Sequence, residues 1–311
     1  MSEAVPLLVL VGPTAAGKSE LALRLAQWLP VELITADSAQ VYRGLDIGTA
    51  KPAPDERHRV PHHLIDVIDG DRRFSVADFQ AATDAVAREI RKRGRIPVLV
   101  GGTGLYVRAV VRRYAFAEGA RDAELRRRLE LRAARQGSAA LHAELQRVDP
   151  AAAARIHPRD TRRIVRALEV YQLTGRPLDR RDLSLPGTPY DPLVVALQVD
   201  RDRLYRRINR RTDRQVAAGW TDEVRALRSR WGPEAPCFDV LGYRELVAYV
   251  DGRRALDAVV RDIKRKTRHY ARRQLTWLRR EHVDHRLDVT GGVRDDHARQ
   301  VAAWMAGKYS G

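Results

Sequence analysis

The fold of the N-terminal region is decided by the stretch Gly12-Pro-Thr-Ala-Ala-Gly-Lys-Ser19. The run Val5–Val11 before it is apolar and typical of a buried strand, and Lys18–Leu29 after it carries leucines at helical spacing. A glycine-rich turn that ends in Lys-Ser between a strand and a helix is typical of a phosphate-binding loop (P-loop). An ordinary glycine turn before a helix is the alternative, but such a turn does not need the complete spacing.

The P-loop predicts a site for a di- or triphosphate. Successive backbone N–H groups form an anion-binding surface, the helix N-terminus adds positive potential, and Lys18 contributes a full charge. The hydroxyl of Ser19 is placed to hold a Mg²⁺ ion. The motif by itself does not identify the compound that carries the phosphates. The expected binding residues are Gly12, Pro13, Thr14, Ala15, Ala16, Gly17, Lys18 and Ser19.

Strands and helices alternate on the C-terminal side of the P-loop. Short apolar runs at Glu32–Ala36, His63–Ile68 and Ile96–Val100 predict strands. Val76–Arg93 has the apolar spacing of a helix, which is ended by Gly94. This alternation predicts an α/β core with a parallel, doubly wound sheet.

The pattern changes in the middle of the chain. From Asp122 to about Thr174 the sequence is rich in Ala, Arg and Leu and has no strand signal. Leu193–Val199 predicts another buried strand, and Asp202–Trp231 and Asp251–Glu281 predict long basic helices. We therefore expect a helical insert within the α/β core. The expected segments are residues 1–117 (first part of the core), 118–190 (insert) and 191–311 (return to the core).

The composition is that of a globular protein. The 311 residues are 44% hydrophobic and 31% charged, which excludes wholesale disorder. No apolar run reaches the ~20 residues that span a membrane, and Val5–Val11 lacks the flanks of a signal peptide. A single cysteine, Cys237, excludes a disulfide framework and a Cys-rich zinc site. We expect a cytoplasmic protein without membrane contact.

The formal net charge of +17 indicates the kind of partner. Residues 201–230 include ten arginines and four acidic residues, and residues 253–280 include eleven Lys or Arg and two acidic residues. Residues 155–181 include eight arginines and three acidic residues. Such clusters predict a polyanionic partner, because Lys and Arg release counterions when they neutralise phosphates. A GC-rich genome that favours arginine is the alternative explanation.

Two further motifs follow predicted strands, where open α/β sheets place their ligands. Asp37-Ser-Ala-Gln-Val-Tyr42 follows the second strand, and an Asp there can act as a base or bind magnesium. Gly101-Gly-Thr-Gly-Leu-Tyr106 follows the fourth strand and brings the hydroxyl of Thr103 to the same edge. A helix-capping Asp and a plain strand-to-helix turn are the respective alternatives.

Three classes of function are compatible with these features. A small-molecule kinase accounts for the P-loop but does not need the basic helices. A nucleic-acid-dependent ATPase accounts for the charge but usually has an acidic pair beside a buried strand, and no such pair stands out. The third class is a transferase in which the P-loop holds the diphosphate of a donor and the basic region holds RNA.

Several motifs together resemble the bacterial tRNA dimethylallyltransferases over residues 7–280, nearly the whole chain. The most specific is Asp37-Ser-Ala-Gln-Val-Tyr-Arg-Gly-Leu-Asp-Ile-Gly-Thr-Ala-Lys-Pro52, because the P-loop alone is generic. The resemblance implies a P-loop nucleoside-triphosphate-hydrolase-like core with a helical insert. It also implies transfer of a dimethylallyl group from its diphosphate to N6 of the adenosine 3′ of the anticodon. The other motifs are 12–19, 61–66, 101–106, Arg207-Ile-Asn-Arg-Arg-Thr-Asp213, Gly242-Tyr-Arg-Glu245 and Arg273-Gln-Leu-Thr-Trp-Leu-Arg279.

The resemblance also implies roles for individual residues. Asp37 is the expected base that takes a proton from N6, and Thr103 is expected to position the adenine. The arginine assigned to the diphosphate corresponds best to Arg211, and the expected cofactor is Mg²⁺. A small-molecule or nucleoside kinase remains the alternative function.

The implied partners are dimethylallyl diphosphate and the anticodon arm of tRNA, bound by a monomer. The target adenosine must leave the anticodon stack to reach such a site, which explains the need for a large basic surface. For each arginine, a solvated helix face is the alternative. The residues expected to contact tRNA are Asp37, Ser38, Ala39, Gln40, Thr103, Arg126, Arg162, Arg163, Ile164, Val165, Arg166 and Arg244.

Overall fold

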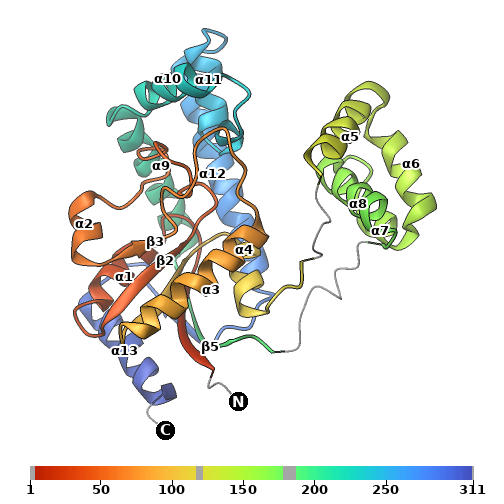
Figure 1. Ribbon diagram of the computed structural model, residues 1–311. Coiled ribbons are helices and arrows are strands. Elements are labelled where there is room, and N and C mark those ends of the chain that lie inside the picture. Colours follow the sequence, from red (N-terminus) through yellow and green to blue (C-terminus); the bar gives the residue numbers. More distant parts are fainter. Residues whose placement is uncertain (1–3, 117–121, 178–186, 310–311) are drawn as a thin grey trace. The chain divides into compact units, whose positions relative to one another are not determined.

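A parallel sheet forms the centre of the larger part of the molecule (Figure 1). The computed structural model describes residues 4–116, 122–177 and 187–309. The strands are β1 Val5–Val11, β2 Val31–Ala36, β3 His62–His63, β4 Ile96–Gly101, β5 Tyr190–Gln198 and β6 His285–Asp288. Their order is β3-β2-β4-β1-β5-β6, and every neighbouring pair is parallel. The predicted parallel α/β core is therefore confirmed.

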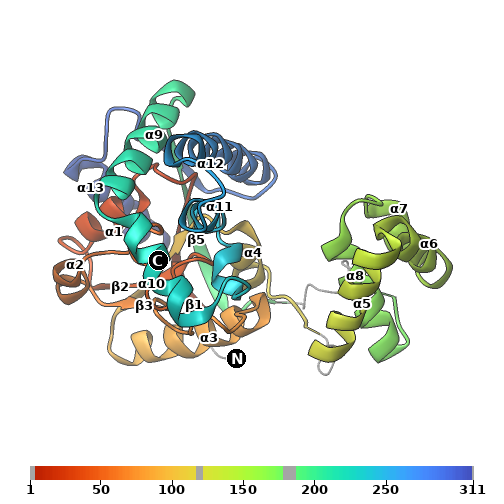
Figure 2. The same ribbon diagram turned by 90° about the horizontal axis from the view of Figure 1, so that it is seen from above.

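Helices cover both faces of this sheet (Figures 1 and 2). The helices of this part of the molecule are α1 Lys18–Leu25, α2 Pro54–Arg59, α3 Val76–Lys92, α4 Gly104–Val111, α9 Arg201–Ala217, α10 Trp220–Trp231, the 3-10 helix η1 Pro236–Asp239, α11 Tyr243–Val250, α12 Leu256–Leu278 and α13 Asp295–Tyr309. Helices α1 and α13 pack on one face, and α3 and α4 pack on the other. Alternation along β1 explains the two layers, because Leu8 and Leu10 face the first pair and Leu7 and Val9 face the second.

The chain divides into two compact units, Met1–Val111 with Thr188–Gly311, and Arg112–Gly187. The second unit is helical and contains α5 Ala123–Gln136, α6 Ser138–Val148, α7 Pro150–Arg155 and α8 Thr161–Thr174. Leu129, Leu141 and Leu168 belong to its own buried core. The expected start of the insert at residue 118 lies outside the described residues, and its expected end at Tyr190 is the first residue of β5.

Two predicted elements differ from the structure. The long helix expected at Asp202–Trp231 is two helices, because Gly219 between α9 and α10 has φ +94° and breaks the helical path. Of the strand expected at His63–Ile68, only His63 lies in a strand, the two-residue β3. Across the described ranges, no helix combines the length and the apolar character that crossing a membrane requires.

Candidate active site

Three neighbouring strands end side by side and bring their loops together. In the sheet register, Gly101 at the end of β4 lies opposite both Val11 of β1 and Ala36 of β2. The P-loop and the loops that begin at Asp37 and Gly102 therefore start next to one another at the carboxyl edge. The backbone N–H of Ser38 donates to Thr103 Oγ1 at 3.2 Å, which joins two of these loops directly.

The P-loop has the backbone conformation that its glycines allow. Gly17 has φ +101°, a left-handed conformation that a side chain would strain, and it precedes the first residue of α1. A Cβ atom at Gly17 would also lie 2.7 Å from Val293 Cγ2. The Lys18 ammonium donates to the carbonyls of Gly12 at 3.0 Å and Pro13 at 2.8 Å, which holds it against the loop.

The charges at this edge leave an excess of positive charge. Burial lowers the pKa of Lys18 to about 8, Asp37 opposes this shift, and Arg211 adds to it. Burial likewise lowers the pKa of Arg211, again opposed by Asp37. Arg211 donates to the Thr49 carbonyl at 3.0 Å and so contacts the loop after β2. Two partly buried cations that share one carboxylate suit an anionic ligand.

Asp37 lies in a turn and does not cap a helix. Its Oδ1 accepts from the backbone N–H of Ala39 at 2.8 Å, and residues 38–41 form turns in which no helix begins. The helix-capping alternative is thus not supported. The carboxylate lies in the field of Lys18, Arg211 and Tyr270, whose pKa values it affects. This places Asp37 beside the cations of the anion site.

Helix α12 contributes three side chains to the site, Tyr270, Gln274 and Trp277. They are spaced four and three residues apart and therefore share one helix face. The buried Gln274 side chain joins two loops: its Oε1 accepts from the backbone N–H of Thr14 at 2.8 Å, and its Nε2 donates to the Gly102 carbonyl at 2.9 Å. This amide fixes the P-loop relative to the loop after β4.

The other two side chains of this helix face contact the loop after β4. A hydrogen bond joins the hydroxyls of Tyr270 and Thr103. Burial, with a contribution from Asp37, raises the pKa of Tyr270 to about 12, so its hydroxyl remains protonated at neutral pH. A Cβ atom at Gly104 would lie 2.4 Å from the indole of Trp277, so only glycine permits this approach.

Helices α9 and α10, which are far away in sequence, form hydrogen bonds with the loop after β2. Glu223 accepts from the backbone N–H groups of Asp46 at 2.9 Å, Ile47 at 2.7 Å and Gly48 at 3.3 Å. The side chain of Gln215 donates to the carbonyls of Ile47 and Gly48, each at 2.8 Å. These bonds pair the donors and acceptors of a loop that has no regular secondary structure.

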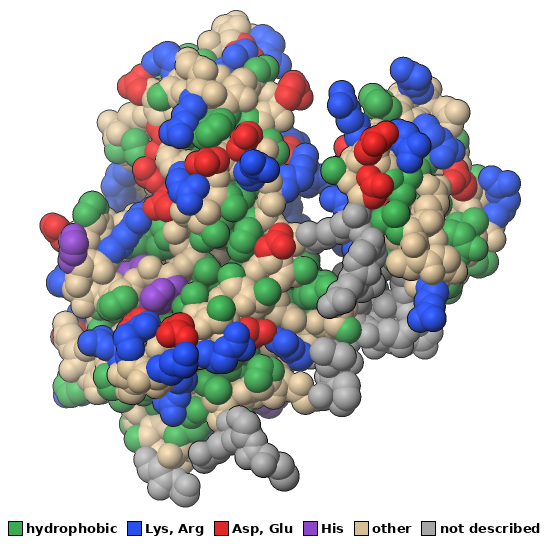
Figure 3. All heavy atoms as spheres, in the orientation of Figure 1, with side chains coloured by type: hydrophobic (Ala, Val, Ile, Leu, Met, Phe, Trp, Pro, Cys, Tyr) green, Lys and Arg blue, Asp and Glu red, His purple; other side chains and the backbone are tan. Residues whose placement is uncertain are grey.

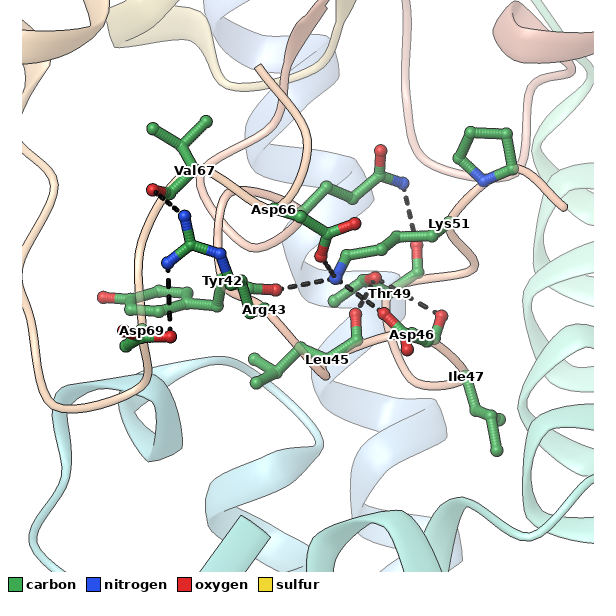
Figure 4. A network of polar contacts seen from close by, with 12 residues as sticks. Tyr42, Arg43, Leu45, Asp46, Ile47, Thr49, Lys51, Asp66, Val67 and Asp69 are labelled. Carbon is green, nitrogen blue, oxygen red and sulfur yellow. Dashed lines mark hydrogen bonds and ion pairs between the residues drawn. The ribbon is translucent and has the colours of Figure 1, made fainter. Parts of the chain in front are cut away.

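A buried lysine organises the same loop from the other side (Figure 4). Lys51, whose side chain is 2% exposed, donates to Asp46 at 2.7 Å, to Asp66 at 2.5 Å and to the Tyr42 carbonyl at 2.6 Å. Burial opposes ionisation of Asp66, but hydrogen bonds from Lys51 and Arg57 outweigh it and lower its pKa. We assign Lys51 to the architecture of the loop, since its three donors are all used, two of them within this loop and one by Asp66 after β3.

On the insert, three of the arginines expected to contact RNA are held by acidic residues of the same unit. Arg126 and Arg166 both donate to the buried Glu169, at 2.5 Å and 2.9 Å, and Arg163 lies 3.3 Å from Asp160. Burial would raise the pKa of Glu169, but the hydrogen bonds of Arg126 and Arg166 outweigh it and lower the pKa. These two arginines therefore support the insert itself.

Two of the expected RNA contacts need correction. Ile164 and Val165 are 0% and 2% exposed and belong to the core of the insert, so their side chains do not reach its surface. Arg162 and Arg163, in the same turn of α8, are exposed. The alternation follows the helical period, because a surface helix buries one face and presents the other.

Arg244 is exposed at the start of α11 and forms an ion pair with Asp239. On the face drawn in Figure 3, Lys and Arg side chains of the core are interspersed with Asp and Glu. The large positive charge of the sequence is thus partly compensated on that face. Arginine clusters in the sequence do not correspond to one uniform positive patch there.

Sequence reasoning missed Tyr270, Gln274 and Glu223. Tyr270 was not among the expected site residues, although its spacing from Gln274 and Trp277 was a signal that the three side chains share a helix face. Glu223 gave no signal, because it is 177 residues away from Asp46, whose backbone N–H it accepts from.

The fold and the site define an α/β protein of the P-loop class, in which the P-loop, Lys18 and Arg211 lie at the carboxyl edge of the sheet. Within this class, the chain belongs to the IPP transferase family, whose sequence profile matches residues 40–281. It is therefore an enzyme of the prenyltransferase type.

Relatives and solved structures agree with this assignment. The tRNA dimethylallyltransferase of Symbiobacterium thermophilum is 53% identical over 288 residues, which cover 92% of this chain and 90% of the relative. That of Geobacillus kaustophilus is 44% identical over 302 residues, 96% of each chain. The structure of a full-length tRNA isopentenylpyrophosphate transferase from Bacillus halodurans has a TM-score of 0.73 at 42% identity and covers 97% of this chain and 96% of that one. A eukaryotic dimethylallyltransferase acting on tRNA has a TM-score of 0.76 at 26% identity, covering 92% of this chain and 74% of that one.

These similarities confirm the resemblance inferred from the sequence motifs. They do not favour the small-molecule kinase that the P-loop alone allowed.

Proposed function

We propose that this enzyme transfers a dimethylallyl group from dimethylallyl diphosphate to N6 of the adenosine 3′ of the anticodon in tRNAs. The product is N6-dimethylallyladenosine. The observation that carries the proposal is the presence of a P-loop, two cations and a carboxylate at one sheet edge. The relatives named tRNA dimethylallyltransferase support the choice of acceptor. We further propose a monomer that works in the cytoplasm.

The P-loop side of the site stabilises the leaving group. When the bond between the allylic carbon and the diphosphate oxygen breaks, the electron pair leaves with the diphosphate. Backbone N–H groups of the P-loop, Lys18 and Arg211 are held in place before the reaction and so stabilise the developing negative charge without reorganisation.

Asp37 acts on the acceptor. The adenine N6 is a weak nucleophile because its lone pair is delocalised into the ring. As the new N6–carbon bond forms, Asp37 accepts the proton that N6 loses, which keeps the nitrogen neutral. Thr103 is held by Ser38 and Tyr270 and positions the adenine next to this carboxylate.

The residues at the P-loop fit a Mg²⁺ ion that is bound together with the diphosphate. Ser19 is exposed in the first turn of α1. Within the described part of the chain, no group of three or more His, Cys, Asp or Glu could hold a metal. A Mg²⁺ ion would therefore be held by the Ser19 hydroxyl and mainly by diphosphate oxygens, as this ion prefers. When bound, it supplies further neutralisation of the leaving group.

The acceptor reaches the site as a nucleotide flipped out of the anticodon loop. Asp37, Ser38, Ala39 and Gln40 border the expected position of the base. Exposed arginines hold the anticodon arm through its phosphates, which positions the RNA without contributing to the reaction itself. These are Arg162, Arg163 and Arg244.

The test is a transfer assay with dimethylallyl diphosphate labelled in the allyl group and with total tRNA. After digestion, the label is expected on N6 of adenosine from the anticodon loop. Wild-type protein without tRNA is the control for release of label by hydrolysis. Absence of labelled adenosine, together with phosphorylation of a small molecule by ATP, would establish the kinase alternative instead.

A further inference from the structure

A cavity beside α9 is lined by three arginines and lies outside the site described above. Its volume is about 450 Å³, and none of its lining residues belongs to the P-loop. Arg203, Arg207 and Arg210 are spaced four and three residues apart and therefore share one face of α9. The remaining lining residues are Thr290 and Gly291, which follow β6.

The three arginines differ in how they are held. Arg207 donates to the carbonyls of Val289 at 2.8 Å and Thr290 at 2.9 Å, and to Ala16 of the P-loop at 3.4 Å. In contrast, the guanidinium groups of Arg203 and Arg210 have no ion pair or hydrogen bond within the described residues, and both residues are exposed. Arg207 thus fixes the wall of the cavity, while the other two keep their donors for a ligand.

The chemistry of the lining selects an anion. Among the described residues that line the cavity there is no carboxylate, and Asp288 at the end of β6 is already bonded to the amide and hydroxyl of Thr290. At the start of α9, Asp200 Oδ1 accepts from the backbone N–H groups of Asp202 and Arg203, so this carboxylate is also already hydrogen-bonded. One guanidinium group can donate two parallel hydrogen bonds to the oxygens of a phosphate. Several guanidinium groups on one helix face therefore suit a ligand with more than one phosphate.

We propose that this cavity is a second phosphate site, separate from the P-loop, and that it accepts free diphosphate. Arg207 joins the two sites physically, because one guanidinium group contacts both the P-loop backbone and the cavity wall. The choice of diphosphate as the ligand rests on the proposed function, in which diphosphate is a product. The inference that the cavity binds a phosphate group is independent of the proposed function. The alternative source of such a phosphate group is the tRNA backbone.

The first arm of the test is equilibrium dialysis with ³²P-labelled inorganic diphosphate. Wild type is expected to bind two equivalents of diphosphate. The double variant Arg203→Ala/Arg210→Ala is expected to bind one equivalent, because affinity at the α9 cavity falls about 10- to 100-fold. Arg206→Ala/Arg214→Ala removes the same charge from the same helix outside the cavity lining and should retain two equivalents. Lys18→Met should weaken the P-loop site and leave the α9 site intact.

The second arm is a salt titration of tRNA binding to the same variants. In Arg203→Ala/Arg210→Ala, the slope of log affinity for tRNA against log salt could fall by up to ~2 while diphosphate binding stays unchanged. This result would overturn the choice of free diphosphate and show that the cavity binds phosphates of tRNA. No change in either arm, or equal losses in Arg206→Ala/Arg214→Ala, would overturn the proposal. Thermal unfolding checks that the variants are folded, which their exposure leads us to expect. Transfer of the labelled allyl group is measured separately, so a failure of the proposed reaction is distinguishable from a failure of this site.

Discussion

The cations of the candidate active site and two arginines of the insert are held in opposite ways. Lys18 and Arg211 donate to backbone carbonyls, and the carboxylate of Asp37 opposes the lowering of their pKa values by burial. On the insert, Arg126 and Arg166 are both bonded to the buried Glu169. A cation that a buried carboxylate already neutralises supports the fold, whereas one held by neutral carbonyls keeps its charge for a ligand. The pairing of each basic residue therefore says more about its role than the density of arginine in the sequence.

The largest expected effect tests the carboxylate that the active-site cations share. Asp37→Asn should lower the single-turnover rate of transfer at saturating tRNA by about 10²- to 10⁴-fold, because the general base is removed. The affinity for tRNA should change little. Asp55→Asn, an exposed residue of α2, is the matched control. A rate within threefold of wild type would rule out Asp37 as the base.

Lys18→Met should weaken binding of the diphosphate donor by about 10- to 100-fold and lower the transfer rate as well, since Lys18 meets the diphosphate before and during the reaction. Because the Lys18 pKa is about 8 in the free protein, donor affinity should fall as pH rises through this value and the ammonium loses its proton. The variant should lack this limb of the pH profile. The measurement is calorimetric titration with the diphosphate donor from pH 7 to 9, and Lys92→Met, at an exposed residue, is the control. Identical dependence of donor affinity on pH in wild type and Lys18→Met would show that Lys18 does not bind the donor.

On the insert, Glu169→Gln should lower the free energy of unfolding by roughly 2 kcal/mol at pH 7, because the charged hydrogen bonds of Arg126 and Arg166 lose their partner. The folded-state pKa of Glu169 is lowered, so its contribution is complete above the unfolded pKa and is lost as pH falls through the folded value. The difference between wild type and variant should therefore shrink in acid. Urea unfolding of the full chain measures it, with the exposed Glu130→Gln as control. Equal stabilities at pH 7 would contradict a supporting role for the pair.

The smallest effect concerns exposed arginines of the insert. Arg162→Ala/Arg163→Ala should reduce the slope of log affinity for tRNA against log salt by up to ~2 if both contact phosphates. The rate on bound RNA should stay nearly unchanged, since these residues position the substrate. The exposed pair Arg88→Ala/Arg91→Ala on α3 is the control of equal charge. Parallel salt titrations of wild type and variant would show that this part of α8 is only a solvated helix face.

Much of the site could be predicted because it is local in sequence. Each of the P-loop, Asp37 and Thr103 directly follows a strand, and parallel strands bring their ends to one edge. Arg211 came from the family resemblance alone, since nothing in an arginine-rich helix distinguishes it from its neighbours. Ile164 and Val165 were misplaced because a motif was transferred as a continuous block, although alternate faces of a helix have opposite environments.

The sequence by itself determined the α/β class, the P-loop and the polar residues that follow each strand, since these depend on short-range periodicity and on glycine conformations. Only the tertiary structure decided which side chains complete the site. Gln274 bonds to Thr14 across 260 positions of sequence, and Arg211 to Thr49 across 162. It also decided which arginines are neutralised. Such pairings depend on the packing of whole helices against the sheet edge, and no local pattern of residues encodes the distance between two atoms so far apart along the chain.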